Sequence, residues 1–315
     1  MNNMKRMDQS VIDETLKLIQ SQEREAEGNP RVKEIINRLL KDLFNAMADL
    51  DITSEEMWIA CDWLTQTGKN NEWGLVFAGL GIEKFIDVKM DWEDEQAGIL
   101  NKTPRTIEGP LYVAGSPETV GYAELETVAE ENAERLYMSG YVRDENGNPV
   151  AGAKVEVWHC NLNGLYSHFD STQPEFNLRR AIITDENGKY EFKSFLPVGY
   201  SCPPGGCTDT LMSLLGRHGS RPAHIHFFVT HPDYRKLTTQ INIEGDPLTY
   251  DDFAFATRPE LVPPVVRISA DEAATYGKDE AFAKIEFDFN VVKEVNGAAA
   301  GENNRLRAAV ESVEA

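Results

Sequence analysis

Two histidines separated by one residue are the sharpest chemical signal in this sequence. His224 and His226 enclose Ile225 and open a run of apolar and β-branched residues that continues to Thr230. Because alternate residues of a strand share a face, both imidazoles can reach one metal ion. All six histidines fall between positions 159 and 231. The spacing is typical of a metal site, although a polar strand face with two hydrogen-bonded histidines would also explain it.

The remaining ligands would select the metal. Carboxylates favour ferrous iron, thiolates favour zinc and phenolates favour ferric iron, since a hard trivalent ion is best matched by anionic oxygen. Tyr166 and Tyr200 lie close to glycines in turn-like segments of the same half of the chain. Taken alone, each of them fits better as a packing tyrosine with a hydrogen-bonded hydroxyl than as a metal ligand.

Two other classes of protein stay open on these residues. A zinc or ferrous hydrolase or oxygenase would combine the histidines with carboxylates such as Asp251 or Asp252, whereas a non-catalytic β-sandwich would only bind ligands. Cys202 and Cys207 could form a zinc half-site, but no second matching pair accompanies them.

The segment up to about Leu100 is predicted to be helical. Between Val32 and Leu50 the apolar residues fall three and four positions apart, which indicates a helix with one buried stripe. Thr53 and Glu56 have the spacing of a capping box at the start of the next helix. We therefore expect a helical region over residues 1–104.

Short apolar and β-branched runs separated by turns follow from Leu136 onward. The tetrapeptide Asp-Glu-Asn-Gly occurs at 144–147 and again at 185–188, and Asn-Gly predicts tight hairpins. We expect a mainly β fold, with an antiparallel β-sandwich over residues 105–293 and a weakly packed, helical tail over 294–315. The predicted strands are 154–158, 181–184, 190–195, 225–230, 237–243 and 283–291.

Composition limits the partners. The formal net charge is −21, with 52 acidic against 31 basic residues, so the surface would repel the phosphates of a nucleic acid. No apolar run approaches the roughly 20 residues of a membrane span, and the first ten residues lack the apolar block of a signal peptide. We expect a cytoplasmic protein with neither a nucleic-acid partner nor a membrane span, and with its four cysteines reduced.

Several segments together resemble the intradiol ring-cleavage dioxygenases. The likeness begins at Gly28-Asn29-Pro30-Arg31-Val32-Lys33 and continues through the run from Thr103 to Tyr112. It then includes the segment from Arg221 to His226 and Asp251-Asp252-Phe253-Ala254. It covers most of the chain except the two termini.

The resemblance implies a site and a reaction. The family's metal ligands fall on Tyr166, Tyr200, His224 and His226, which would hold one non-haem Fe(III) per subunit. Its catalytic residues fall on Arg221, Gln240 and Tyr200, the last as a base. The implied reaction opens catechol between its two hydroxyls with O₂ to give cis,cis-muconate, a step of aromatic catabolism in the β-ketoadipate pathway. Charge counting agrees, since Fe³⁺ is neutralised both by two phenolates with one hydroxide and by one phenolate with a catecholate dianion.

The resemblance also implies a substrate pocket and an assembly. Four of its wall positions look like the plain-catechol version rather than the chlorocatechol one, and Ala78 replaces a proline common in the family, which would admit methylcatechols. The helical region implies a homodimer, with a phospholipid bound in its apolar surface. The pocket residues are Leu75, Ala78, Ile107, Gly109, Pro110, Leu111, Cys202, Phe253 and Ala254.

Overall fold

A computed structural model describes residues 7–24, 27–294 and 307–309 of the chain. The chain divides into two compact units, Met1–Gly68 and Lys69–Ala315, and each is described by itself. The domain limits expected from the sequence, at residues 104 and 293, stay predictions. Within the described residues no helix is long and apolar enough to cross a membrane. All four cysteines are free thiols, and the cytoplasmic location stays a prediction.

The first unit is made of helices, as the sequence predicts. Asn29 begins α2 by accepting hydrogen bonds from the amides of Arg31 and Val32. Thr53 and Glu56 form the expected capping box, with each side chain bonded to the other's backbone amide. The helices are α1 (Gln9–Gln20), α2 (Pro30–Asp49) and α3 (Ser54–Lys69), which runs one residue past the unit's end.

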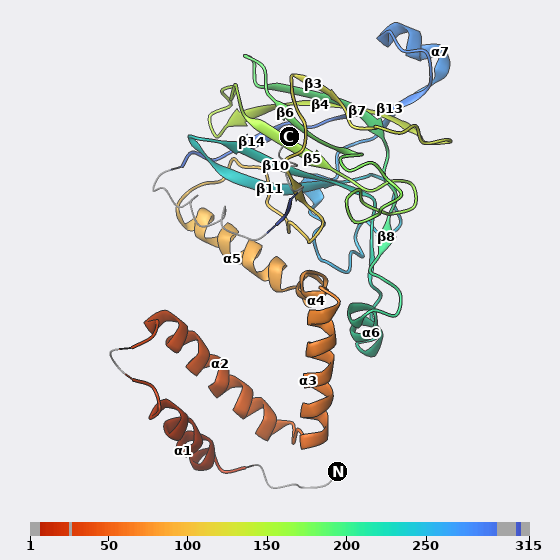
Figure 1. Cartoon of the computed structure of the whole chain (residues 1–315). Helices are drawn as coiled ribbons and strands as arrows, with labels where there is room; N and C mark the ends of the chain where they lie inside the picture. Colours follow the sequence, from red (N-terminus) through yellow and green to blue (C-terminus); the bar gives the residue numbers. More distant parts are fainter. Residues whose placement is uncertain (1–6, 25–26, 295–306, 310–315) are drawn as a thin grey trace, which may run out of the picture. The chain divides into compact units, whose positions relative to one another are not determined.

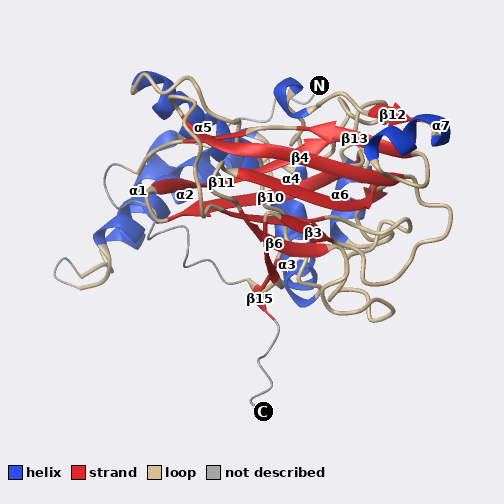
Figure 2. Ribbon diagram, turned by 90° about the horizontal axis from the view of Figure 1, so that it is seen from above, coloured by secondary structure: helices blue, strands red, loops and turns tan. Residues whose placement is uncertain are grey.

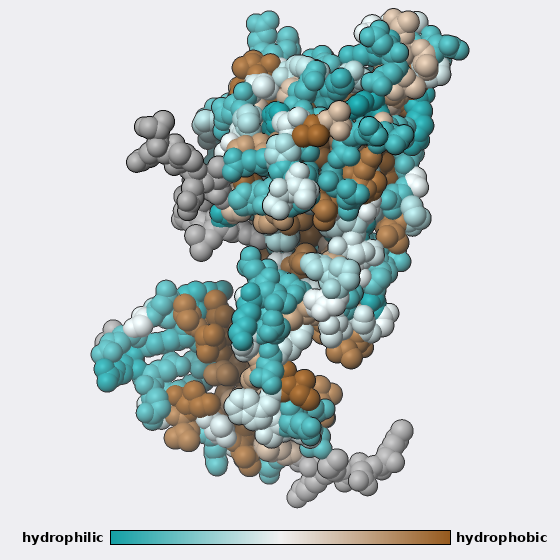
Figure 3. All heavy atoms as spheres, turned by 45° about the vertical axis from the view of Figure 1, so that its right-hand side comes forward, coloured by the Kyte–Doolittle hydropathy of each residue, from teal (hydrophilic) through white to brown (hydrophobic). Residues whose placement is uncertain are grey.

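The apolar stripe of α2 is open rather than buried. No residue of this helix is buried in the chain, and five of its large apolar side chains are exposed by 42–58%. Figure 3 shows hydrophobic residues gathered over the helices of this unit. The exposed residues of the stripe are Val32, Ile35, Ile36, Leu39 and Leu43.

Two packed sheets form most of the second unit (Figures 1 and 2). The first sheet has the order β11-β10-β5-β6-β2, and the second has the order β12-β13-β4-β7-β3 with β14 also on β4. The first comprises β2 (Glu118–Val120), β5 (Lys154–Trp158), β6 (Arg179–Ile183), β10 (His224–His231) and β11 (Tyr234–Asn242). The second comprises β3 (Tyr122–Glu124), β4 (Arg135–Asp144), β7 (Lys189–Phe195), β12 (Val266–Ile268), β13 (Phe282–Glu286) and β14 (Phe289–Val291).

The expected antiparallel sandwich is wrong in one respect, because both sheets are mixed. β4 pairs parallel with β13 and β14, β3 pairs parallel with β7, and β2 pairs parallel with β6. The structure is also 31% helical and 25% strand, so "mainly β" holds for the sandwich and not for the chain. These parallel partners lie far apart in sequence and are joined by long connections, which local strand patterns do not reveal.

The core lies between the two sheets and determines which face of β10 looks outward. Ile225, Phe227 and Val229 point into the sandwich with at most 1% exposure. Because side chains alternate along a strand, His224 and His226 project from the opposite face of the same sheet. That outer face is covered by helices and loops, not by water, since both histidines are almost fully buried.

Helices and long loops cover this outer face. Figure 1 shows α5 beside β11, and Arg235 of β11 donates a 2.8 Å hydrogen bond to Asp94 of α5. Glu72 ties α4 to α6 by accepting hydrogen bonds from the amides of Cys207 and Thr208. The helices are α4 (Trp73–Gly79), α5 (Ile82–Gln96), α6 (Cys207–Leu214) and α7 (Ala270–Ala273), with short 3₁₀ turns η1 (Pro259–Leu261) and η2 (Ala274–Tyr276).

The two repeated tetrapeptides form tight turns with different outcomes. The first turn, at 144–147, folds the chain back so that Val150 pairs with Val142, as a hairpin does. The second, at 185–188, instead carries the chain from β6 in one sheet to β7 in the other. The prediction of a hairpin is therefore confirmed at the first site and wrong at the second.

Part of the C-terminal tail packs beside the substrate-pocket segment. Most of the predicted tail, residues 295–306 and 310–315, lies outside the described residues. The described part forms β15 (Ala308–Ala309), which pairs parallel with β1 (Val113–Ala114), so it is a strand and not the expected helix. Arg307 places its guanidinium on Glu108, at 2.8 and 2.9 Å.

Candidate metal centre

The register of β10 brings the two histidines and a glutamine to one face. His226 lies opposite Gln240 of β11 and Trp158 of β5, and His224 lies opposite Asn242. The two Nε2 atoms are 3.1 Å apart. That separation matches two ligands bound to one ion at about 2.1 Å with an angle of about 95° between them. The geometry is therefore compatible with the metal site that the spacing predicts.

Both imidazoles are neutral and fixed in orientation. Burial lowers the pKa of His224 to about 3 and lowers that of His226 well below its usual value, with Arg221 adding to both effects. The Nδ1 of His224 bonds to the carbonyl of Pro222 at 2.6 Å, which leaves its Nε2 lone pair for another partner. The ring of His226 stacks on Trp158, with centroids 4.9 Å apart and planes 4° from parallel.

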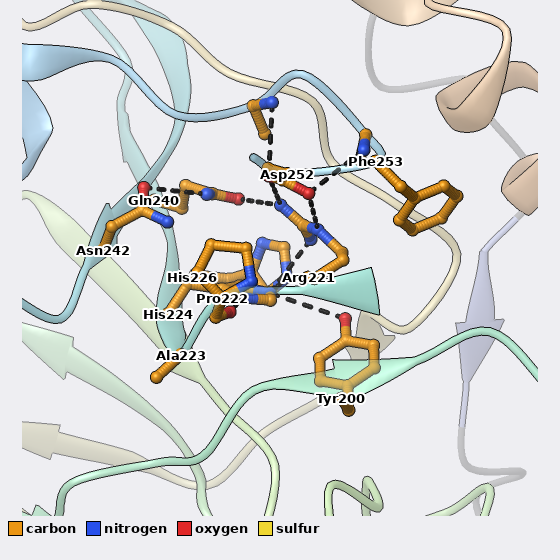
Figure 4. A network of polar contacts seen from close by, with 12 residues as sticks. Tyr200, Arg221, Pro222, Ala223, His224, His226, Gln240, Asn242, Asp252 and Phe253 are labelled. Carbon is orange, nitrogen blue, oxygen red and sulfur yellow. Dashed lines mark hydrogen bonds and ion pairs between the residues drawn. The ribbon is translucent and has the colours of Figure 1, made fainter. Parts of the chain in front are cut away.

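The two predicted tyrosines lie beside the histidines. Tyr200 is in β8 (Tyr200–Ser201), which pairs with β9 (Ser220–Arg221), and its hydroxyl is 3.4 Å from the Nε2 of His224 (Figure 4). The ring of Tyr166 is 5.6 Å from that of Tyr200 and 6.4 Å from that of His226. A Cβ added at Gly164 would lie 2.7 Å from the Cβ of Tyr200, so this close approach needs glycine.

A missing partner marks the centre of this group. Tyr166 is 3% exposed, and its buried hydroxyl has no hydrogen-bond partner, which is costly for a polar atom away from water. Burial raises the pKa of Tyr166 well above its usual value, and the neighbouring Tyr200 raises it further. Two neutral imidazoles and two phenols form a donor set that a ferric ion fits, because the ion's charge would ionise the phenols.

The carboxylates and thiols that would complete the alternative metal sites do not point toward His224 and His226. Asp252 faces Arg221, and Asp251 lies 3.1 Å from His218 with its side chain 76% exposed. Among the described residues no group of three or more His, Cys, Asp or Glu side chains could hold a metal ion. The described residues therefore do not provide the ligand set of a zinc or ferrous enzyme. They also provide no further ligands for a zinc site at Cys202 and Cys207.

Arg221 is a buried cation fixed from three sides (Figure 4). Its Nε and Nη2 each donate a 3.1 Å hydrogen bond to Asp252, and Nη2 also donates to Oε1 of Gln240 at 2.8 Å. Its Nη1 is 2.9 Å from the Nε2 of His224. Burial opposes the charge, but Asp252 raises the pKa of Arg221 above its usual value, so the guanidinium stays charged.

A recess with an open mouth lies against this group. It is open to solvent, and apolar side chains make most of its wall. Eight of the nine predicted pocket residues line it together with Tyr200, Arg221 and His226. The ninth, Cys202, is buried against Gly219, and its place in the wall stays a prediction. The eight are Leu75, Ala78, Ile107, Gly109, Pro110, Leu111, Phe253 and Ala254.

Two family models match consecutive parts of the chain. Residues 29–98 match the model described as the N terminus of catechol dioxygenase, and residues 107–293 match the model described as dioxygenase. The second match alone covers more than half of the chain. The chain belongs to the intradiol catechol dioxygenase family.

Individual members of the family are similar over nearly their whole length. The catechol 1,2-dioxygenase of Acinetobacter baylyi is 52% identical over 286 residues, which is 90% of this chain and 92% of that protein. The structure of catechol 1,2-dioxygenase from Acinetobacter sp. ADP1 has a TM-score of 0.90 at 50% identity and covers 97% of this chain and 99% of its own. A chlorocatechol 1,2-dioxygenase of Rhodococcus opacus is more distant, at 34% identity over 83% of this chain and 98% of its own.

Membership makes this chain an intradiol dioxygenase, and the family uses non-haem iron.

Three side chains beside the site did not stand out in the sequence as parts of it. The sequence suggests Asp252 only as an alternative metal ligand, whereas in the structure it anchors Arg221. Trp158 could have been found from strand register opposite His226, whereas no sequence signal places Arg179 beside Tyr166.

Proposed function

We propose that this chain opens catechol between its two hydroxyls with O₂, giving cis,cis-muconate, at one Fe(III) per subunit. The observation that carries the proposal is the convergence of two imidazoles and two phenols beside an apolar recess that Tyr200 and Arg221 also line. His224, His226, Tyr166 and Tyr200 are the proposed ligands. The 3.1 Å separation of the imidazole nitrogens and the unpartnered Tyr166 hydroxyl support this assignment.

A ferric ion held by these four residues would supply the Lewis acidity that makes a chelated catechol ring reactive toward O₂. The chain's own residues then handle protons and orientation. Tyr200 forms part of the recess wall, and burial raises the pKa of its phenol, so its phenolate would be basic enough to accept a proton from a catechol hydroxyl. Tyr200 is therefore the proposed internal base.

Arg221 provides a fixed positive charge at the recess. It lines the cavity and is 4% exposed. Because Asp252 and Gln240 already hold the guanidinium in place, it need not move during the reaction. Negative charge that develops on the substrate ring would be stabilised there. Gln240 acts by holding the Nη2 group of Arg221, with its own amide donating to Asn242 at 3.2 Å.

The apolar wall selects a flat aromatic ring. Leu75 and Ala78 come from α4, and Pro110 packs against Gly74 of the same helix, where an added Cβ would lie 3.0 Å from the proline's Cβ. We propose catechol as the preferred substrate, with methylcatechols accepted beside Ala78. One methyl group is worth only about 1–3 kcal/mol of discrimination, so the preference would be graded.

We also propose that the chain forms a homodimer through its helical region, residues 1–104. The open apolar stripe of α2 supports this, because exposed apolar faces of this kind are usually covered by a partner. A phospholipid bound in the same apolar surface is a further part of the proposal. Light scattering should give twice the chain mass of 35.3 kDa, and solvent extraction with mass spectrometry should release the lipid.

The product from catechol in air tests the reaction. The iron-loaded protein should be wine-red through phenolate-to-iron charge transfer and should convert catechol to cis,cis-muconate, which lacks the yellow colour of the semialdehyde made by cleavage beside the hydroxyls. A colourless iron-replete protein would rule out the tyrosine ligands. Yellow semialdehyde would rule out cleavage between the hydroxyls.

A further inference from the structure

Arg179 is a fully buried arginine next to the proposed ligand Tyr166. It is the first residue of β6 and is 1% exposed. Its Nε donates to Oγ of Ser167 at 2.9 Å, and its Nη2 donates to the carbonyl oxygen of Ser167 at 3.0 Å. Its guanidinium carbon lies 5.7 Å from the centre of the Tyr166 ring, within the range of a cation–π contact. Arg179 therefore contacts both Tyr166 and the residue that follows it.

The charge of Arg179 has no carboxylate to balance it. Among the described residues no Asp or Glu oxygen lies within ion-pair distance, and the Nη1 atom is buried with no hydrogen-bond partner. Arginine stays protonated at every pH at which the protein would be studied. An unbalanced buried charge is expensive and is rarely kept without a role.

The loop that carries Tyr166 depends on this anchor. Ser167 donates its hydroxyl to the carbonyl of Asn177 at 2.6 Å while accepting from Arg179, so one arginine links both sides of the loop. His168 and Leu178 at the loop's two ends have positive φ angles of 72° and 60°, which non-glycine residues rarely adopt. The surrounding contacts must hold such a backbone in place.

We propose that Arg179 is a positioning residue for Tyr166 that also sets the charge environment of this ligand. Its two hydrogen bonds to Ser167 fix the direction of the Tyr166 ring. Its positive charge stabilises negative charge on the phenolate when iron is bound. This inference rests on the proposed function, since it takes Tyr166 to be a ligand of ferric iron.

The two roles predict different signatures. A nearby cation lowers the energy of the phenolate's electrons, so charge transfer to iron needs more energy with Arg179 present than without it. Loss of the charge should therefore move the visible band to longer wavelength. Loss of the anchor should let iron dissociate faster, on the order of 10- to 100-fold, as for other groups that orient a metal ligand.

Two variants and a matched control separate these roles. Arg179→Gln removes the charge but keeps an amide donor near Ser167, so its band should shift to longer wavelength. Arg179→Lys keeps the charge but loses the paired hydrogen bonds, so its band should stay in place while a chelator removes iron faster. Arg180→Gln makes the same change on the next residue, whose Nη1 donates only to backbone carbonyls, and it should leave both properties unchanged.

The outcomes can be distinguished from a failure of the proposed function. If the wild-type iron-loaded protein lacks the visible band, Tyr166 is not a ligand and the proposed function itself fails. If wild type has the band but Arg179→Gln leaves it at the same wavelength, the electrostatic role is wrong. An equal shift in Arg179→Lys or Arg180→Gln would also overturn it, and melting of the iron-free proteins identifies any variant that does not fold.

Discussion

Arg221 and Asp252 form a buried ion pair in which two nitrogens of the guanidinium each lie 3.1 Å from one oxygen of the carboxylate. The same carboxylate accepts hydrogen bonds from the amides of Ala254 and Ala256. Asp252 thus fixes both the arginine and the loop that carries Phe253 and Ala254 into the recess wall. One carboxylate controls the position of a charge and of an apolar surface.

Asp252→Asn should lower kcat on the order of 10²-fold, because a misplaced arginine no longer meets the developing charge. It should also cost about 3 kcal/mol of folding stability, since Arg221 is left buried without its counter-charge. Steady-state kinetics and denaturant unfolding measure the two effects. Asp251→Asn is the control, because that side chain is 76% exposed, and its kinetics should match wild type. An unchanged kcat in Asp252→Asn would contradict the anchoring role.

Tyr200→Phe should weaken the visible band and ring opening together. The substitution removes the proposed ligand oxygen and base while leaving the ring against His224, and loss of a base costs typically 10²- to 10⁴-fold in rate. Absorption spectra and single-turnover measurements on the same sample test this. Tyr234→Phe, on β11, is a suitable control and should keep both signals. Normal activity of Tyr200→Phe would show that the ligand assignment is wrong.

Asp87 on α5 should make the protein less stable as the pH rises from about 4 to 6. Burial raises the pKa of Asp87 to about 6 from 3.8, even though Arg258 favours its charged form. The folded state therefore binds the proton more tightly than the unfolded state, and this stabilisation is complete below pH 3.8 and lost above pH 6.

Asp87→Asn removes that dependence. At pH 7.5 the variant should be more stable than wild type by about 3 kcal/mol, the equivalent of a shift of about two pKa units. By pH 3.5 the difference should vanish, because Asp87 is then protonated in both states. Denaturant unfolding at both pH values measures this. Asp62→Asn, at an exposed position of α3, is the control and should change the free energy of unfolding little. A gain that persists at low pH would point to packing instead of charge.

Arg307→Ala should weaken substrate binding more than turnover. The side chain pairs with Glu108, which lies between the recess residues Ile107 and Gly109, so its loss frees one wall of the recess. A loss of about 1 kcal/mol would raise KM roughly fivefold and leave kcat nearly unchanged. Arg267→Ala removes a comparable pair with Glu134 on the exposed surface and serves as the control. Equal kinetics in the two variants would contradict the role of Arg307.

Local patterns in the sequence predict the helices, the strands and the histidine pair. The stripe of α2, the capping box at Thr53 and the shared face of His224 and His226 each depend on neighbours within a few residues. The roles of Tyr166 and Tyr200 could not be derived this way, because each looks like a packing residue until the fold brings them together. Resemblance to a family singled them out.

Non-local relationships account for what the sequence did not predict. The direction of β13 and β14 against β4 depends on long connections, and the second Asp-Glu-Asn-Gly turn crosses between sheets because β7 pairs with β4 and not with β6. Asp251 and Asp252 are adjacent in sequence, yet only the second turns inward to Arg221. Strand periodicity carries no information about either choice.

The strand pairing of β15 with β1 has a consequence for how the site is assembled during protein synthesis. Glu108 is translated 199 positions before its partner Arg307, after which β15 follows at once. All the residues that line the recess, from Leu75 to Ala254, are therefore synthesised before Arg307, whose contact with Glu108 holds the segment 107–111. The growing chain therefore contains the strands of both sheets and all the recess residues before Arg307 can pair with Glu108, so this contact is the last of the recess contacts that can form.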